Sequence, residues 1–258
     1  MINVDGIILV LSCQKYLNTR LKEFKLPKDN YGDWKVIYVI GDLFLDSDYK
    51  INENVITIKC EDSYIHLLKK LVLALKCVYE LYDIKEGVLR SGDDLIYNEN
   101  LLKTFLESTK YDFMGKSPTH KNLLQKDITT ELLQKTRYDH FMVNYYLSHP
   151  DDFNNPQHNL KGVDICKYTQ RPETAISPGG TLYYISNKSC KVLIDHMEQI
   201  NYNIFHFDDF SQSYPYTIED CAVSYILYFH KISFIHVDNM YADCPSKDAI
   251  AYHTNMYK

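Results

Sequence analysis

The 258-residue sequence has no long uninterrupted apolar segment, no excess of basic residues and no closely spaced pair of cysteines. Its longest apolar runs fall well short of the roughly 18 residues that a membrane-spanning helix needs. The formal net charge is −6, so binding to nucleic acid or to an anionic membrane is not predicted. The seven cysteines are an odd number without a C-x-x-C pair, which argues against a disulfide framework. We therefore expect a soluble, cytoplasmic protein with reduced thiols.

The chain also lacks a low-complexity linker, an internal repeat and a Gly-rich phosphate-binding loop. Without a linker we expect a single domain over residues 1–258, which is long enough to bury a core without a disulfide or a structural metal. The N-terminal stretch MINVDGIILVLSCQ has no basic start, carries Asp5 and contains only a short apolar run. These features favour a buried first strand over a secretory signal.

Short apolar runs and one amphipathic segment alternate in the first third of the chain. GIILVL (6–11), WKVIYVIGD (34–42), NVITIKC (54–60) and GVLR (87–90) are typical of strands buried on both faces of a parallel sheet. Between the last two runs, apolar residues recur every three or four positions from Tyr64 to Tyr82. This periodicity predicts a helix with Asp62 or Ser63 as its cap. The order of elements predicts an α/β fold.

The second half of the chain alternates less regularly. ITTELLQKTRYDHFMVNYYLSH (128–149) is predicted to be helical, and the polar stretch Pro150–Pro178 is predicted to form loops. GTLYYIS (180–186) resembles a strand, and NKSCKVLIDHMEQI (187–200) resembles a helix.

Two adjacent carboxylates, Asp93 and Asp94, follow the predicted strand GVLR after two intervening residues. Open α/β sheets bind their ligands at the carboxyl ends of strands. Paired carboxylates suit a hard cation such as Mg²⁺ or Mn²⁺, which relieves their repulsion. The pair alone therefore predicts either a metal site or a turn. Two other pairs, Asp151–Asp152 and Asp208–Asp209, lie in loop-like sequence and are predicted to be solvated turns.

Three separate blocks resemble the β-1,3-galactosyltransferase and Fringe superfamily, over roughly Ile7 to the C-terminus. The first block is EDSYIHLLKKLVLALKCVYE followed by GVLRSGDDLIYN. In it His66 replaces the family's usual Asn, and Gly92 occupies the first position of a three-Asp motif. SPGGTLYYIS looks like the family's Gly-Gly segment, and YTIEDCAVSYIL looks like its acidic-Asp-Cys block. The residues that match in the first block are Asp62, Ser63, Tyr64, Leu67, Lys70, Asp93 and Asp94.

The resemblance implies a GT-A fold, with a Rossmann-like, mostly parallel sheet flanked by helices. It implies transfer of a sugar, with inversion, from a UDP-sugar to an acceptor hydroxyl of a glycan or glycoconjugate, with Mn²⁺ or Mg²⁺ as cofactor. Residues 1–110 would bind the nucleotide sugar, and residues 111–258 would form the acceptor side. Asp94 would be the metal ligand, and Asp93 would contact the ribose or the donor sugar.

Other residues of the matching block are assigned to the same donor site by this resemblance. They are Asp62, Arg90, Ser91 and Gly92. Because Gly92 leaves the acidic motif one carboxylate short, the role of Lys70 stays open between a phosphate ligand and a solvated helix residue.

Inverting transfer also requires a base that removes the proton of the acceptor hydroxyl. The resemblance points to Asp220 as this base and to Glu219 as an acceptor contact. The pattern alone allows a second interpretation, because Thr217 and Asp220 precede the apolar run CAVSYILYF and have the spacing of a capping box. In that case Asp220 would only close the N-terminus of a helix.

Further candidates follow from position. Gly179 and Gly180 would let the backbone approach a sugar, or would form a plain turn. Relatives place a metal-binding His near the C-terminus, which makes His253 a candidate ligand, and His236 in ISFIHV is a rival predicted to lie in the core. The nucleotide base or ribose would rest against residues that follow the first two strands, Ser12, Cys13 and Asp42.

Three hypotheses are therefore open. The first is a metal-dependent glycosyltransferase. The second is a catalytically inactive GT-A-like protein that binds a sugar nucleotide or serves as a scaffold, suggested by Gly92. The third is a nucleotidyltransferase, disfavoured because the chain has no Gly-rich loop or basic cluster for a triphosphate.

Overall fold

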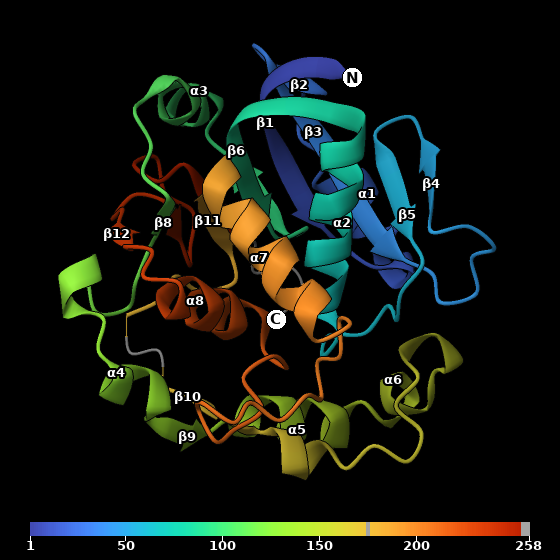
Figure 1. Ribbon diagram of the computed structural model, residues 1–258. Helices are drawn as coiled ribbons and strands as arrows, with labels where there is room; N and C mark the ends of the chain where they lie inside the picture. Colours follow the sequence, from blue (N-terminus) through green and yellow to red (C-terminus); the bar gives the residue numbers. More distant parts are fainter. Residues whose placement is uncertain (174–175, 254–258) are drawn as a thin grey trace.

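The computed structural model describes residues 1–173 and 176–253, and its centre is a nine-stranded sheet (Figure 1). The strands lie in the order β12–β8–β11–β6–β1–β3–β5–β4, with β2 paired to β3. The neighbours β6, β1, β3 and β5 are parallel, which confirms the predicted α/β class and its parallel central strands. The bounds are β1 Ile2–Leu11, β2 Asn30–Tyr31, β3 Trp34–Gly41, β4 Tyr49–Asn52, β5 Val55–Ile58, β6 Tyr82–Ser91, β8 Phe113–Gly115, β11 Leu182–Ser186 and β12 Ile235–His236.

Helices cover both faces of this sheet. Helices α2 (Leu67–Leu81), α7 (Asn187–Gln199) and α8 (Glu219–Phe229) pack on one face, where α2 and α7 cross in front of the strands in Figure 1. Helix α3 (Glu99–Glu107) packs on the other face, together with the short helix α1 (Arg20–Glu23). Burial on both sides explains why the central strands read as continuous apolar runs rather than alternating ones.

The carboxyl ends of the parallel strands meet at one edge of the sheet. Strand β1 pairs with β6 so that Val10 lies opposite Ser91, and the two strands end at or just after this pair of residues. Strand β11 is antiparallel to β6, with Leu182 opposite Ser91, so the segment that enters β11 reaches the same edge. Because β8, β11 and β12 belong to this sheet, residues beyond 110 contribute to it as well.

A small sheet brings the end of the described chain back to this edge. It joins β7 (Leu95–Tyr97), β13 (Tyr241–Ala242) and β14 (Ala251–His253), and in it His253 lies opposite Leu95. Leu95 follows the acidic pair directly. The sheet register therefore places His253 next to Asp94, although the two residues are far apart in sequence.

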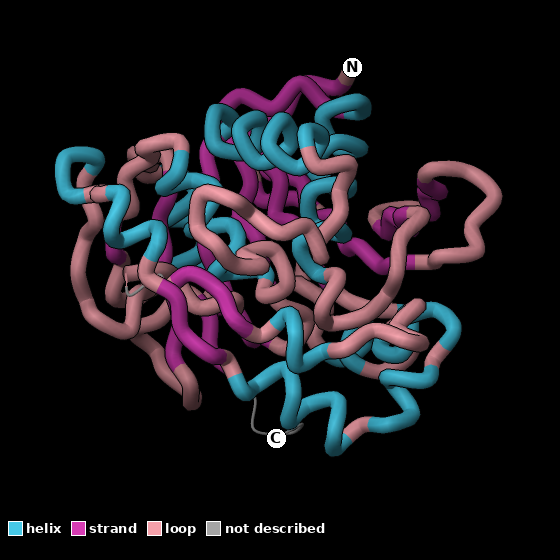
Figure 2. Tube along the Cα trace, turned by 60° about the horizontal axis from the view of Figure 1, so that its bottom comes forward, coloured by secondary structure: helices cyan, strands magenta, loops and turns pink. Residues whose placement is uncertain are grey.

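Residues 128–149 do not form the single helix that was predicted. They form α4 (Thr130–Gln134), β9 (Thr136–Tyr138) and α5 (His140–Ser148), because β9 pairs with β10 (Gln170–Pro172) in a separate two-stranded ribbon. The predicted loop after Pro150 contains α6 (Pro150–Asn154) and β10. Figure 2 shows this part of the molecule as short helices joined by long loops. The 3₁₀ helices among the described residues are η1 Gln14–Tyr16, η2 Gln125–Asp127, η3 Pro156–His158 and η4 Ile165–Tyr168.

Three further features of the described chain concern the cap of α2, membrane-spanning helices and disulfides. Helix α2 begins at Leu67 and its N-cap, His66, makes no side-chain cap bond, so the predicted cap at Asp62 or Ser63 is wrong. None of the helices in the described part of the chain is long and apolar enough to cross a membrane. No disulfide joins any of the cysteines there.

Candidate functional site

A cavity of about 740 Å³ lies at the carboxyl edge of the sheet. Most of the predicted site residues line it, although they come from segments distributed over almost the whole chain. These lining residues are Ser12, Cys13, Asp62, Lys70, Arg90, Gly92, Asp93, Asp94, Gly180, Glu219, Asp220 and His253. Three predicted residues do not line it, namely Asp42, Ser91 and Gly179.

The acidic pair lies just past β6, as predicted, and its two members differ in exposure. Asp93 is 9% exposed, and its Oδ2 accepts a 2.6 Å hydrogen bond from the Ser12 hydroxyl at the end of β1. Burial raises the pKa of the Asp93 carboxyl above its usual value, against the opposing effects of Ser12 and Arg20. Asp94 is partly exposed to the cavity. Asp94 is therefore the better placed of the two to meet a ligand.

His253 faces the Asp94 carboxylate. Its Nδ1 lies 3.6 Å from Asp94 Oδ1, and its Nε2 lies 3.1 Å from the Thr181 hydroxyl. The predicted pairing of His253 with the acidic motif thus has a structural basis in the β7–β14 register. The rival candidate, His236, lies on β12 and does not line the cavity.

A guanidinium lies between the two acidic side chains. Arg20 Nη1 is 3.2 Å from Asp93 Oδ1 and 3.6 Å from Asp94 Oδ2. The Arg20 guanidinium also stacks over the ring of Tyr16, 4.0 Å from its centroid. Sequence reasoning missed both residues, because the segment Gln14–Glu23 carries no pattern that links it to a motif more than 70 positions away.

Asp62 and Lys70 form a buried ion pair in the cavity wall. Lys70 Nζ lies 2.5 Å from Asp62 Oδ1 and also donates to the Ser12 carbonyl, at 2.8 Å. Asp62 accepts further hydrogen bonds from the backbone N–H groups of Gly41 and Gln14. Lys70 is 1% exposed, so the hypothesis of a solvated helix residue is wrong. The pair ties α2 to the ends of β1 and β3.

Arg90 and Glu219 form a second buried pair, on the other side of the acidic motif. Arg90 Nη2 lies 2.9 Å from Glu219 Oε2, and Arg90 also donates to the Gly180 carbonyl. The other oxygen of Glu219 accepts from the Tyr183 hydroxyl. Burial raises the pKa of the Glu219 carboxyl, and Arg90 opposes this effect. Because both of its oxygens are engaged, Glu219 is better suited to fix Arg90 and the Gly180 segment than to contact an acceptor.

Asp220 lies in the first turn of α8 and is partly exposed to the cavity. Its Oδ2 accepts from the Gly180 N–H at 3.0 Å, and its Oδ1 accepts from the Cys221 N–H at 2.8 Å. The capping box suggested by the sequence is not formed. The Thr217 hydroxyl donates to the Tyr168 carbonyl instead, and the N-cap of α8 is Ile218, without a side-chain cap bond. The two backbone bonds to Asp220 fix its orientation without closing it off.

The glycines of the site differ in the room that a side chain would have: it is ample at Gly180 but not at Gly179 or Gly92. A Cβ at Gly180 would lie 3.4 Å from Glu219 Oε2 and 3.6 Å from Asp220, and a Cβ at Gly179 would lie 2.6 Å from the Tyr241 hydroxyl oxygen. At Gly92, where the resembling family has Asp, a Cβ would lie 3.2 Å from Asp94 Oδ1. A side chain at position 92 would therefore crowd the neighbouring carboxylate.

Two aromatic side chains, Tyr64 and Tyr145, line one part of the cavity, and Phe141 packs against Tyr64 beside it; we call these three residues the aromatic rim. Tyr64 and Phe141 are 45% and 58% exposed, and the Tyr64 ring lies 5.7 Å from Phe141 and 5.6 Å from Tyr145. Burial of its hydroxyl, and then the negative charges of Asp220 and Glu219, raise the pKa of Tyr64. Tyr64 shares the cavity with the acidic residues at the start of α8.

Of the rival acidic pairs, Asp151–Asp152 lies in helix α6 and not in a turn, whereas Asp208–Asp209 does lie at a turn, with Asp209 exposed. Asp152, in α6, is 9% exposed, lines the cavity and accepts a 2.6 Å hydrogen bond from the Tyr145 hydroxyl. Asp208 accepts from the Tyr225 hydroxyl at 2.7 Å and from the Ser211 N–H. The two tyrosine partners come from α5 and α8, and the local sequence around the acidic pairs did not reveal them.

The remaining candidates have structural surroundings of their own. Asp42 accepts from the Gln157 side chain, which does line the cavity, and from the Phe44 N–H. Ser91 is fully buried, and its hydroxyl lies against Tyr97 and the Gly92 carbonyl. Burial, reinforced by the charge of Asp62, raises the pKa of the Cys13 thiol to about 11. Cys13 therefore stays protonated at neutral pH and does not provide a nucleophilic thiolate.

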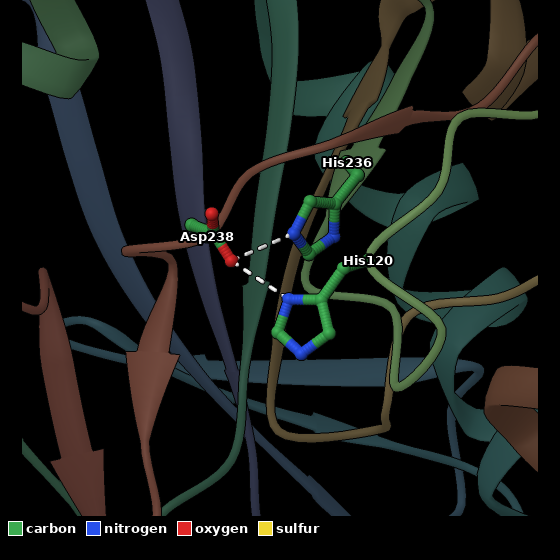
Figure 3. A group of neighbouring side chains, drawn as sticks. All are labelled: His120, His236 and Asp238. Carbon is green, nitrogen blue, oxygen red and sulfur yellow. Dashed lines mark hydrogen bonds and ion pairs between the residues drawn. The ribbon is translucent and has the colours of Figure 1, made fainter.

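Outside the cavity, His120, His236 and Asp238 form a cluster whose ligand atoms lie within 4.8 Å of one another. Figure 3 shows both imidazoles directed at one Asp238 oxygen, 2.8 Å from His120 Nδ1 and 3.0 Å from His236 Nε2. His236 Nδ1 accepts the Ser117 N–H at 3.0 Å, so the neutral ring carries its proton on Nε2. A metal ion would need the lone pair at that nitrogen. The cluster is thus arranged for hydrogen bonds rather than for metal ligation.

Comparisons with known proteins add little. No family model and no curated protein sequence match the chain. Among solved structures it is similar to mouse xyloside xylosyltransferase 1 in its apo form, with a TM-score of 0.44, 9% sequence identity and 99% of each chain covered. A likeness this remote carries no argument about chemistry, which depends on the residues described above.

Proposed function

We propose that the protein is a metal-dependent glycosyltransferase that moves a sugar, with inversion, from a UDP-sugar to an acceptor hydroxyl, and that its fold is of the GT-A type. The observation that supports this proposal is the convergence of an acidic pair, an imidazole and a separate carboxylate on one cavity at the carboxyl edge of a parallel sheet. Such edges are where open α/β sheets bind nucleotides. The cavity volume of about 740 Å³ falls within the range of small-molecule sites.

The residues present fit a hard divalent cation. Asp94 and His253 face each other across 3.6 Å, Asp93 adjoins them, and a positive group already lies between the two carboxylates. Carboxylate oxygens and a neutral imidazole are suitable ligands for Mn²⁺. We assign Asp94 and His253 as ligands, with Asp93 held by Ser12 at the adjoining donor site. A cation bound there would neutralise the charge that develops on a departing diphosphate.

Asp220 is the base in this proposal. It lies partly exposed on the cavity wall, and backbone N–H groups of Gly180 and Cys221 hold its carboxylate in one orientation. A fixed carboxylate that can accept a proton from a hydroxyl is what single-displacement transfer requires. Glu219, buried against Arg90, maintains the wall from which Asp220 projects.

The aromatic rim supports a sugar as acceptor. Tyr64 lines the cavity with a partly exposed ring that contacts Phe141, and Asp220 lines the same cavity. An aromatic face with a polar tip offers apolar contact area and a hydrogen-bonding group together. A sugar ring resting on Tyr64 would bring its hydroxyls near Asp220.

The test combines binding and turnover in two variants. Asp94→Asn should lose most Mn²⁺-dependent binding of UDP in calorimetric titrations, while its fold stays intact because the residue lies outside the core. Asp220→Asn should bind UDP and Mn²⁺ as the parent does, but release UDP from a panel of UDP-sugars more slowly by a factor on the order of 10² to 10⁴. Asp209→Asn, which changes an exposed acid of another pair, is the control.

The outcomes separate the hypotheses. Parent-like binding by Asp94→Asn would remove that residue from the site. Undiminished UDP release by Asp220→Asn, with or without simple sugar acceptors such as p-nitrophenyl glycosides, would remove the base. Mn²⁺-dependent UDP binding by the parent without any UDP release would favour the inactive, sugar-nucleotide-binding hypothesis.

A further inference from the structure

Arg20 occupies the place between the Asp93 and Asp94 carboxylates where a cation shared by both would bind. A single nitrogen, Nη1, contacts Asp93 Oδ1 at 3.2 Å and Asp94 Oδ2 at 3.6 Å. These oxygens come from two residues that are adjacent in sequence, and their like charges repel each other. The guanidinium thus neutralises the pair in the way that a bound metal ion would.

The guanidinium and a metal ion exclude each other. A small divalent cation lies about 2.0–2.2 Å from its oxygen ligands, and a cation at that distance from the same oxygens would overlap the position of Nη1. The two positive groups would also repel each other at close range in a partly buried site. Arg20 must therefore withdraw before Asp93 and Asp94 can share a metal ion.

The segment that carries Arg20 is lightly anchored. Helix α1 has only four residues, its N-cap Thr19 makes no side-chain cap bond, and Leu21 is its only buried residue. The guanidinium itself rests on the partly exposed ring of Tyr16. Segments with few buried apolar contacts open at low free-energy cost. Displacement of Arg20 is therefore compatible with an otherwise unchanged fold.

We propose that Arg20 is an internal competitor of the divalent cation: it holds the acidic pair while the site lacks a metal ion, and metal binding displaces it. This inference rests on the proposed function and extends it, because it adds an oxygen of Asp93 to the cation ligands Asp94 and His253. It adds that the affinity for the metal alone is set partly by the cost of breaking the Arg20 contacts.

The experiment measures binding of Mn²⁺ alone, without nucleotide, from the electron paramagnetic resonance signal of the free ion. Arg20→Gln removes the competing charge and should bind Mn²⁺ about tenfold more tightly than the parent, equivalent to the loss of one partly buried ion pair. Arg20→Lys keeps a charge but loses the planar guanidinium, and its affinity should lie between the two. Lys22→Gln makes the same charge change at an exposed position of the same helix and should leave the affinity unchanged.

Thermal unfolding provides a second measurement. Without metal, Arg20→Gln leaves two neighbouring carboxylates uncompensated and should melt below the parent, and Mn²⁺ should raise its melting temperature more than it raises the parent's. If Arg20→Gln does not fold, Arg20→Lys carries the comparison of affinities. Mn²⁺ affinity in Arg20→Gln equal to or weaker than that of the parent would overturn the inference.

The design distinguishes this inference from the proposed function. Loss of Mn²⁺ binding in Asp94→Asn, together with unchanged affinity in Arg20→Gln, would leave the metal site standing and remove Arg20 as a competitor. Absence of Mn²⁺ binding in both the parent and Arg20→Gln would overturn this inference, and Mn²⁺-dependent UDP binding by the parent would then decide the proposed function separately.

Discussion

The Asp62–Lys70 pair should be one of the most strongly coupled pairs in the molecule. Lys70 and Asp62 are 1% and 5% exposed, and their charged atoms lie 2.5 Å apart. Removing one partner of a buried ion pair leaves the other charge uncompensated and costs about 3–5 kcal/mol. The two substitutions should nevertheless differ, because the partners have different remaining contacts.

Lys70→Met leaves the Asp62 carboxylate with two N–H donors, from Gly41 at 2.9 Å and Gln14 at 2.7 Å. We therefore expect a loss near 3 kcal/mol, the lower end of that range. Asp62→Asn removes the negative charge beside Lys70, and its single amide oxygen can serve only one side of the former carboxylate. If that oxygen accepts from Gly41 and Lys70, the amide NH₂ is set against the Gln14 N–H. The cost of this substitution should be near 5 kcal/mol.

The double variant should cost much less than the sum of the two losses, because neither charge is then left alone. We expect a coupling energy of about 2–3 kcal/mol. Urea unfolding followed through the fluorescence of the single tryptophan, Trp34, which is buried, measures all three variants. Lys76→Met is the control on the same helix, since Lys76 pairs with Glu198 at the surface and should cost less than about 1 kcal/mol. Additive losses in the double variant would refute the reasoning.

Two further predictions concern pH and the acceptor. Burial lowers the pKa of His66 and of His196 to about 4 from 6.5, so the unfolded chain binds more protons in that interval, and the free energy of unfolding should fall as pH drops from about 6.5 to about 4. Urea midpoints across this interval measure the effect, and a constant midpoint would contradict it. Tyr64→Ala should raise the KM for a p-nitrophenyl glycoside acceptor about two- to tenfold without changing UDP affinity, whereas Leu147→Ala, at an exposed position away from the cavity, should change neither.

The position of the site could be predicted from the sequence because of a general property of parallel sheets. The strands that end near Ser12, Asp42 and Asp93 were recognised as continuous apolar runs, and parallel strands bring their carboxyl ends to one edge. That reasoning placed the acidic pair correctly without knowledge of any contact. His253 required the resemblance, because its approach to Asp94 depends on the short β14, which no local pattern indicates.

Contacts between distant segments could not be predicted in the same way. Arg20 is an ordinary charged residue in sequence, and only the fold brings it to Asp93. The sequence left the role of Lys70 open between a phosphate ligand and a solvated helix residue. Its position on α2 does not reveal that Asp62 lies against it. The Thr217–Asp220 spacing matched a capping box, but the Thr217 hydroxyl donates a hydrogen bond to the Tyr168 carbonyl instead. In each case the contact that decides the role of the residue is formed only when the chain has folded.

The departure of Gly92 from the acidic motif can be judged from these contacts. If the missing carboxylate were the partner of Lys70, its loss would leave a buried ammonium group alone, at a cost of several kcal/mol. Lys70 is instead paired with Asp62, so no buried cation depends on position 92. The Gly92 N–H is also satisfied, by the Thr181 carbonyl at 2.9 Å, and a Cβ there would lie 3.2 Å from Asp94 Oδ1. A third carboxylate would therefore crowd and repel a pair that already needs Arg20 to neutralise it, and its absence by itself gives no reason to consider the site defective.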